Sequence, residues 1–191
     1  MLDAFQDLLA ELATRRALRA EFRRDPASVL SSRDLDARER TALAALPAAA
    51  LERYAASLVA KRWTDVRRIV PSTLRVYPRF RERYRAWALE HPAPLTDSVL
   101  PPGPKEALRA LDPLRSEILR DPSLAPYTAD LLAYEVLAAC ARSDGVLRTM
   151  SSLYPMHEIV RELRGPCIPI DPEPKKTLIR FSRTGARWKA V

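Results

Sequence analysis

Apolar residues recur at helical spacing along most of the chain. Leu2, Phe5, Leu8, Leu9 and Leu12 lie at spacings that place them on one face of a first helix. Two further stretches, 47–70 and 78–90, have the same period, and each begins at a proline. Proline suits the first helical turn because its missing N–H would have no partner there. The pattern therefore predicts an N-terminal helical bundle.

A proline-rich connector interrupts this pattern at residues 93–104. It divides the sequence into an N-terminal helical region, 1–92, and a C-terminal part, 105–191. Helical periodicity resumes at 106–119 and 127–142, and we expect the whole chain to form one compact unit.

The C-terminal residues alternate with a period of two, which is typical of strands. Residues 146–150 predict a short strand, 155–164 a short helix, and 177–182 and 186–191 a β-hairpin closed by Thr184-Gly185. A lone hairpin is only marginally stable in water. It must therefore pack on helices, pair with 146–150 or accept a strand from elsewhere, and we expect it to lie outside the helical body. The predicted fold is mainly α, with a small C-terminal α+β part.

Composition narrows the class of protein. Hydrophobic residues make up 47% of the chain, but no apolar run approaches the roughly 20 residues of a membrane span. The acid-containing N-terminal residues do not resemble a secretory signal, so we expect a cytoplasmic protein without membrane contact.

Catalytic and metal-binding patterns are absent from the sequence. The histidines, His91 and His157, and the cysteines, Cys140 and Cys167, are too widely spaced for a local ligand motif. His157 is more typical of a polar residue at a helix start than of a ligand. We expect no catalytic residue, metal site or cofactor in this chain.

Positive charge is concentrated in one stretch. The formal net charge is +8, and residues 61–87 contain nine cations and two acids. Such a stretch can bind nucleic-acid phosphates or an acidic partner surface. The interleaved aromatic residues fit a core stripe better than a base-stacking surface. These residues are Tyr77, Phe80, Tyr84 and Trp87.

Glu135 interrupts the apolar helix LLAYEVLAA. A buried acid needs a partner. The sequence leaves two explanations open, a structural ion pair with an arginine or an acid presented to a partner protein.

Three segments of the C-terminal half, LLAYEVLAACARS, VLRTMSSLYPMHEIV and TLIRFSRTGARWKAV, together resemble one family. Its pattern is an acid in an apolar helix, a strand running into Tyr-Pro and a short helix, and a final hairpin with an arginine between apolar residues. Glu135, Tyr154-Pro155 and Arg180 occupy these places. The family was once labelled a DNA-binding domain, and its members accompany multinuclear non-heme iron oxidative enzymes in peptide-natural-product gene clusters. Over nearly its whole length, the chain resembles the MbnC subunits of methanobactin biosynthesis.

The resemblance implies a non-catalytic subunit that forms a heterodimer with an MbnB-like multinuclear iron enzyme. Together they would bind a ribosomal precursor peptide and use oxygen to convert core cysteines into oxazolone–thioamide groups of a copper-chelating product. The iron would belong to the partner enzyme. Glu135, Tyr154 and Pro155 are then candidates for partner binding. The alternative is a basic helical nucleic-acid-binding protein that uses residues 61–87.

The predicted hairpin offers a route to peptide recognition. An extended leader peptide can add a strand to an unpaired sheet edge through backbone hydrogen bonds. The candidate residues are Thr177, Leu178, Ile179, Arg180, Phe181, Arg187 and Trp188. The alternative is that residues 146–150 or the proline-rich segment before the hairpin cover this edge.

Overall fold

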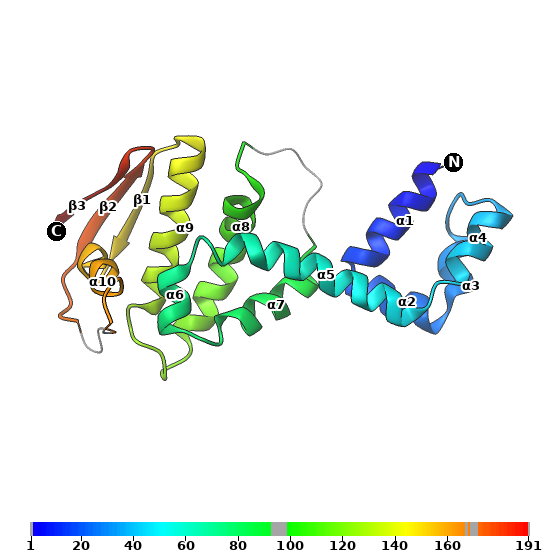
Figure 1. Cartoon of the computed structure of the whole chain (residues 1–191), viewed down its shortest axis with the longest axis horizontal. Helices are drawn as coiled ribbons and strands as arrows, with labels where there is room; N and C mark the ends of the chain where they lie inside the picture. The colour runs from blue at the N-terminus through cyan, green and yellow to red at the C-terminus, as the bar shows by residue number, and fades with distance from the viewer. Residues whose placement is uncertain (1, 93–98, 167, 169–171, 191) are drawn as a thin grey trace. The chain divides into compact units, whose positions relative to one another are not determined.

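The structure is a computed structural model that describes residues 2–92, 99–166, 168 and 172–190 (Figure 1). Its helices are α1 (Leu2–Thr14), α2 (Arg16–Arg24), α3 (Pro26–Ser31), α4 (Ala37–Ala44), α5 (Ala48–Val66), α6 (Pro71–Val76), α7 (Phe80–Glu90), α8 (Pro102–Leu119), α9 (Thr128–Asp144) and α10 (Met156–Glu162). Its strands are β1 (Arg148–Ser152), β2 (Thr177–Ser182) and β3 (Gly185–Ala190). The mainly helical fold with a small C-terminal sheet confirms the predicted fold class.

Local sequence signals explain several helix boundaries. The Asp25 carboxylate accepts a hydrogen bond from the Ser28 amide at 3.1 Å, and Pro26 occupies the first position of α3. Asp36 and Glu39 form a capping box at the start of α4, with reciprocal backbone hydrogen bonds of 2.7 and 2.8 Å. Pro71 begins α6 in the same way as Pro26 begins α3.

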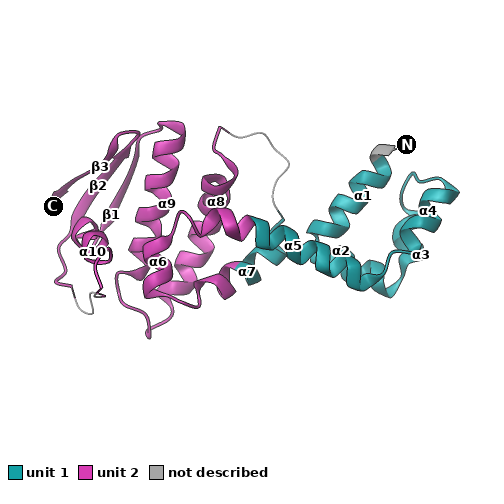
Figure 2. Cartoon of the chain, viewed as in Figure 1, with its two compact units in different colours: residues 1–61, 85–95 teal, residues 62–84, 96–191 magenta. Residues whose placement is uncertain are grey.

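The chain divides into two compact units, residues 1–61 with 85–95 and residues 62–84 with 96–191 (Figure 2). This division differs from the predicted boundary at 93–104, because it passes through α5 and α7. Part of the predicted connector is also helical. Pro102 and Pro104 lie in the first turn of α8, where an amide hydrogen is not needed. Residues 93–98 lie outside the described residues.

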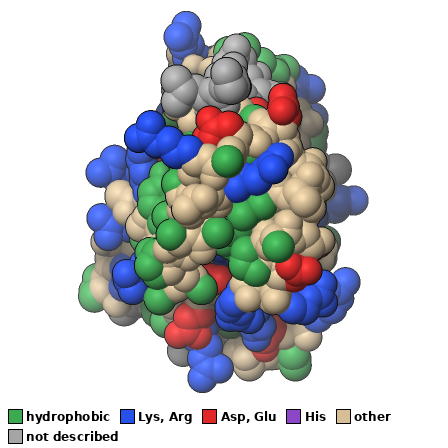
Figure 3. Space-filling model, turned by 90° about the vertical axis from the view of Figure 1, so that its right-hand side faces the viewer, with side chains coloured by type: hydrophobic (Ala, Val, Ile, Leu, Met, Phe, Trp, Pro, Cys, Tyr) green, Lys and Arg blue, Asp and Glu red, His purple; other side chains and the backbone are tan. Residues whose placement is uncertain are grey.

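The first unit is built around leucines from its helices. Leu8 and Leu12 of α1 are fully buried, as the sequence spacing predicts. They share a core with Phe22, Val29, Leu30, Leu35, Leu43 and Leu51. Figure 3 shows one face of the molecule, on which hydrophobic side chains lie among Lys, Arg, Asp and Glu side chains.

The second unit contains an antiparallel sheet in the order β1-β2-β3. Strands β1 and β2 pack against α9, and β2 places Ile179 and Phe181 in the core. The other fully or nearly buried members of this core are Tyr127, Leu131, Ala138, Ala141, Met156, Ile159 and Leu163. The expectation that the hairpin lies outside the helical body is therefore wrong. Its alternate apolar residues are part of the hydrophobic core beside α9 and α10.

The aromatic residues of the basic stretch are core residues. In the second unit, the Trp63 ring lies 6.3 Å from Phe80 and 5.4 Å from Tyr84 between ring centroids. In the first unit, Trp87 is buried and stacks on His91 at 5.0 Å. The preference for a core stripe over a base-stacking surface is confirmed.

No single helix among the described residues has both the length and the apolar composition to cross a membrane. Helices α4 and α5 meet that test only as a pair, bent by 82°.

Candidate functional site

Strand β3, one of the two outer strands of the C-terminal sheet, has a free hydrogen-bonding edge in the part of the chain that the structure describes. Strand β2 lies between β1 and β3, so β3 pairs on one side only. Ser182 and Gly185 form the pair that closes the hairpin turn. Because pairing alternates along an antiparallel ladder, the backbone N–H and C=O groups of Ala186, Trp188 and Ala190 face away from β2.

The central position of β2 restricts the predicted peptide-binding set. Residues Thr177 to Phe181 pair with β1 on one side and with β3 on the other. Their backbone groups are occupied, so these residues offer no edge to a further strand. This corrects the expectation that either strand of the hairpin could receive a peptide backbone. The predicted pairing of 146–150 is found at β1, and it covers β2 rather than β3.

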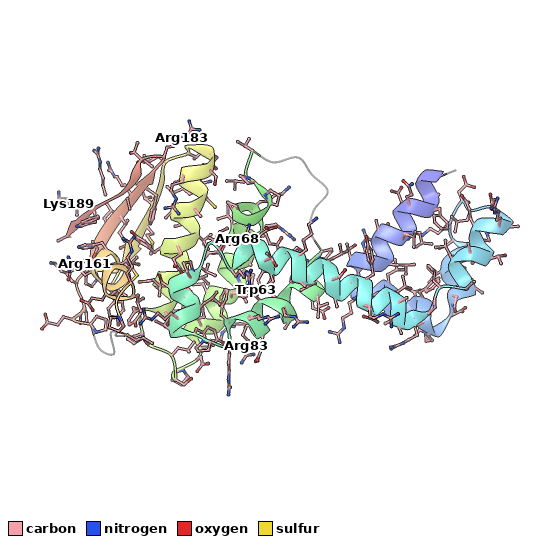
Figure 4. The ribbon with its side chains drawn as sticks, viewed as in Figure 1. Trp63, Arg68, Arg83, Arg161, Arg183 and Lys189 are labelled. Carbon is pink, nitrogen blue, oxygen red and sulfur yellow. The ribbon has the colours of Figure 1, made fainter. Side chains whose placement is uncertain are left out.

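The two faces of the sheet differ in chemistry. Thr177, Ile179 and Phe181 face the helices and are buried. Leu178, Arg180, Arg187 and Lys189 lie on the opposite face, since Arg180 is opposite Arg187 and Leu178 is opposite Lys189. Figure 4 shows Arg183 at the hairpin turn and Lys189 further along β3. The outer face therefore presents cations beside one apolar side chain.

Trp188 is the large apolar residue of the free strand. It is opposite Ile179 and is 52% exposed. Its indole stacks on the imidazole of His157 from α10, with ring centroids 4.1 Å apart and planes inclined by 13°. The stack connects β3 to α10 and holds one face of the indole.

The surroundings of His157 disfavour its charged form. Burial lowers the pKa of His157 below its usual value, although the nearby Glu158 carboxylate opposes that shift. The ring nitrogen Nδ1 is buried and has no hydrogen-bond partner among the described residues. Sequence reasoning missed this contact, because His157 and Trp188 belong to different elements and share no local pattern.

Tyr154 and Pro155 lie between β1 and α10, and Tyr154 contacts the first residue of β2. The carbonyl of Tyr154 accepts a hydrogen bond from the Thr177 hydroxyl at 3.3 Å. The Tyr154 ring meets Tyr127 edge to face at 6.3 Å between centroids. Pro155 is buried at the start of α10. Tyr154 itself is half-buried, so part of its side chain is accessible to a partner.

Glu135 lies apart from this strand and stabilises α6. Its carboxylate accepts hydrogen bonds from the Ser72 amide at 2.7 Å, the Thr73 amide at 2.9 Å and the Thr73 hydroxyl at 2.8 Å. Burial raises the pKa of Glu135, and these hydrogen bonds oppose that rise. Among the described residues, the acid is thus satisfied by two backbone amides and a hydroxyl of α6 rather than by an arginine.

Some cations of the basic stretch, residues 61–87, form hydrogen bonds within the protein, and the others are exposed at its surface. Arg62 donates to the buried Glu106 carboxylate at 2.5 Å, and Tyr84 donates to the same carboxylate at 3.1 Å. Arg75 donates to backbone carbonyls. The exposed members are Lys61, Arg67, Arg68, Arg79, Arg81, Arg83 and Arg85.

Across the residues that the structure describes, no three His, Cys, Asp or Glu side chains gather as metal ligands. Cys140 is buried and contacts the Pro104 carbonyl at 3.5 Å, and burial raises the pKa of its thiol. Cys167 lies outside the described residues.

No family model, curated protein or solved structure matches this chain.

Proposed function

We propose that the chain is a recognition subunit that receives an extended precursor peptide at the free edge of β3. The observation that carries this proposal is the one-sided pairing of β3 in the described structure. Backbone groups of Ala186, Trp188 and Ala190 are positioned to pair with an added strand, and such pairing gives affinity with little dependence on sequence.

Side chains near this edge supply selectivity. The exposed part of Trp188 offers an apolar surface, and its stack on His157 limits the motion of the ring. Arg187 and Lys189 place positive charge on the other face of the same strand. This combination favours a peptide strand that alternates apolar and acidic side chains, because successive residues of a strand face opposite sides.

The enzymatic half of the proposal rests on the resemblance of the sequence to the partner subunits of iron-dependent oxidative enzymes. The iron and the oxygen chemistry would be supplied by an MbnB-like partner. That partner would convert core cysteines to oxazolone–thioamide groups of a copper-chelating peptide. The role of this chain is to hold the leader and to contact the enzyme, with Tyr154 as an accessible candidate contact.

Co-expression tests this assignment. The chain would be co-expressed with an iron enzyme and a short cysteine-containing precursor encoded beside its gene. We expect a stable heterodimer, and a mass change in the precursor that requires both proteins. A precursor modified equally well by the enzyme alone would contradict the proposed role.

A further inference from the structure

A cavity of about 360 Å³ lies within the second unit, separate from the β3 edge. Small-molecule sites commonly have volumes of about 300–1,000 Å³. Arginines from four parts of the chain line it. Arg68 follows α5, Arg75 lies on α6, Arg142 lies on α9 and Arg164 follows α10. Figure 4 shows Arg68 close to the end of α5.

The guanidinium groups differ in how they are held. Arg75 donates to the carbonyls of Leu163, Gly165 and Pro166, which fixes its position. Arg68, Arg142 and Arg164 form no ion pair with a described carboxylate. Arginines that line a cavity without acidic partners are a typical arrangement for binding oxyanions, because the guanidinium fork matches carboxylate and phosphate geometry.

One carboxylate, that of Glu135, also lines the cavity. Both of its oxygens already accept hydrogen bonds from Ser72 and Thr73 at the start of α6. Those amide dipoles offset part of its charge. The four guanidinium groups outweigh the single acid, so the cavity is positive.

The remaining wall is largely apolar. It is formed by Ile69, Pro71, Ala138, Val160 and Leu163. Tyr134 lies beside them, and its ring meets the buried Phe181 at 5.3 Å between centroids. Burial raises the pKa of Tyr134, and the positive charges of Arg142 and Arg164 oppose that rise. Tyr134, Arg142 and Arg164 thus line the same cavity, so it offers an aromatic surface and two guanidinium groups together.

We propose that this cavity binds an organic oxyanion, a carboxylate or phosphate group carried on a small apolar body. The oxyanion pairs with Arg142 and Arg164, and the body packs against Val160, Leu163 and Tyr134. The site does not depend on peptide binding at β3.

Calorimetric titration of the full chain tests the site with four probes. Phenyl phosphate and phenylacetate combine an anion with an apolar ring, inorganic phosphate lacks the ring, and benzyl alcohol lacks the charge. We expect one of the two aromatic anions to bind more tightly than inorganic phosphate, and benzyl alcohol not to bind. The tighter aromatic anion identifies the preferred oxyanion.

Matched arginine variants locate the binding. Arg142→Gln and Arg164→Gln should each weaken the preferred probe by about tenfold or more, since charge-assisted hydrogen bonds are lost. Arg161→Gln is the control, because Arg161 is an exposed arginine on α10 outside the lining (Figure 4). Circular dichroism confirms that each variant is folded. Failure of all anions to bind, or equal weakening by Arg161→Gln, would overturn the proposal.

Discussion

The indole of Trp188 on β3 lies on the imidazole of His157 on α10, at 4.1 Å between ring centroids. Both rings are nearly parallel, and the histidine is placed where burial disfavours its charged form. The proposed peptide-binding strand is therefore attached to the helical part of its unit through a histidine whose pKa is lowered by burial.

This contact predicts a pH-dependent stability. Unfolded histidine binds a proton near pH 6.5, whereas the lowered pKa of His157 delays protonation in the folded chain. The unfolded state then holds more protons between the two values, so the free energy of unfolding falls as pH decreases below about 6.5 and levels off beneath the folded pKa. Urea denaturation between pH 7.5 and 5 measures this loss.

His157→Gln should reduce that pH dependence, because the titrating group is removed. An unchanged profile in His157→Gln would show that the stacked histidine does not couple to folding.

Glu135 should contribute to stability through α6. Glu135→Ala leaves the Ser72 and Thr73 amides without their carboxylate acceptor, and we expect a loss of about 2 kcal/mol in the free energy of unfolding. Glu117→Ala, at an exposed acid on α8, should change it by about 0.5 kcal/mol or less. Chemical denaturation compares them, and equal effects would be inconsistent with the capping role.

Neighbouring residues on β2 should differ sharply in their effect on stability. Ile179 is fully buried in the core, whereas Leu178 faces outward. Ile179→Ala should cost about 3 kcal/mol, and Leu178→Ala about 0.5 kcal/mol or less. Thermal unfolding of both variants provides the measurement. A larger loss for Leu178→Ala would contradict the assigned faces of the sheet.

The hydrophobic pattern predicted the helices and the hairpin because local spacing and prolines determine them. Pro71 is the first residue of α6, Pro78 lies between α6 and α7, and the alternation around Ile179 identified β2. A period of two shows which side chains share a face, but it does not show which strand lies in the centre. The boundary between the two units falls within α5. It depends on tertiary packing, so the proline-rich composition of residues 93–104 did not predict it.

The candidate site was only partly predictable for related reasons. Arg187 and Trp188 were identified from the hairpin, and they lie on the free strand. The partner of Trp188 is distant in sequence, and the partners of Glu135 are backbone amides, which carry no residue-type signal. The arginine cavity was also missed, because Arg68, Arg142 and Arg164 converge only in the folded chain.

Duplex DNA should bind weakly to this chain. The aromatic residues of the stretch 61–87 are buried, so phosphate contacts from exposed cations such as Arg79 and Arg81 remain. Such binding should disappear as salt is raised, and removal of one contact should reduce the salt slope by about 0.9. Fluorescence anisotropy at several KCl concentrations measures this. Tight, sequence-selective binding at physiological salt would favour the nucleic-acid alternative.

The free edge of β3 can be blocked without disturbing its pairing with β2. The Ala190 amide faces away from β2, so Ala190→Pro removes a hydrogen-bond donor from the free edge only. Ala190→Ser is the matched control, since it changes the side chain and keeps the amide. Both variants should have nearly the wild-type free energy of unfolding.

Calorimetric binding of the precursor peptide to these two variants tests peptide recognition at β3 most directly. Loss of one backbone hydrogen bond predicts binding about tenfold weaker for Ala190→Pro, and near wild-type binding for Ala190→Ser. If the folded Ala190→Pro variant binds the precursor as tightly as Ala190→Ser does, the peptide does not pair with β3 and the central claim is contradicted.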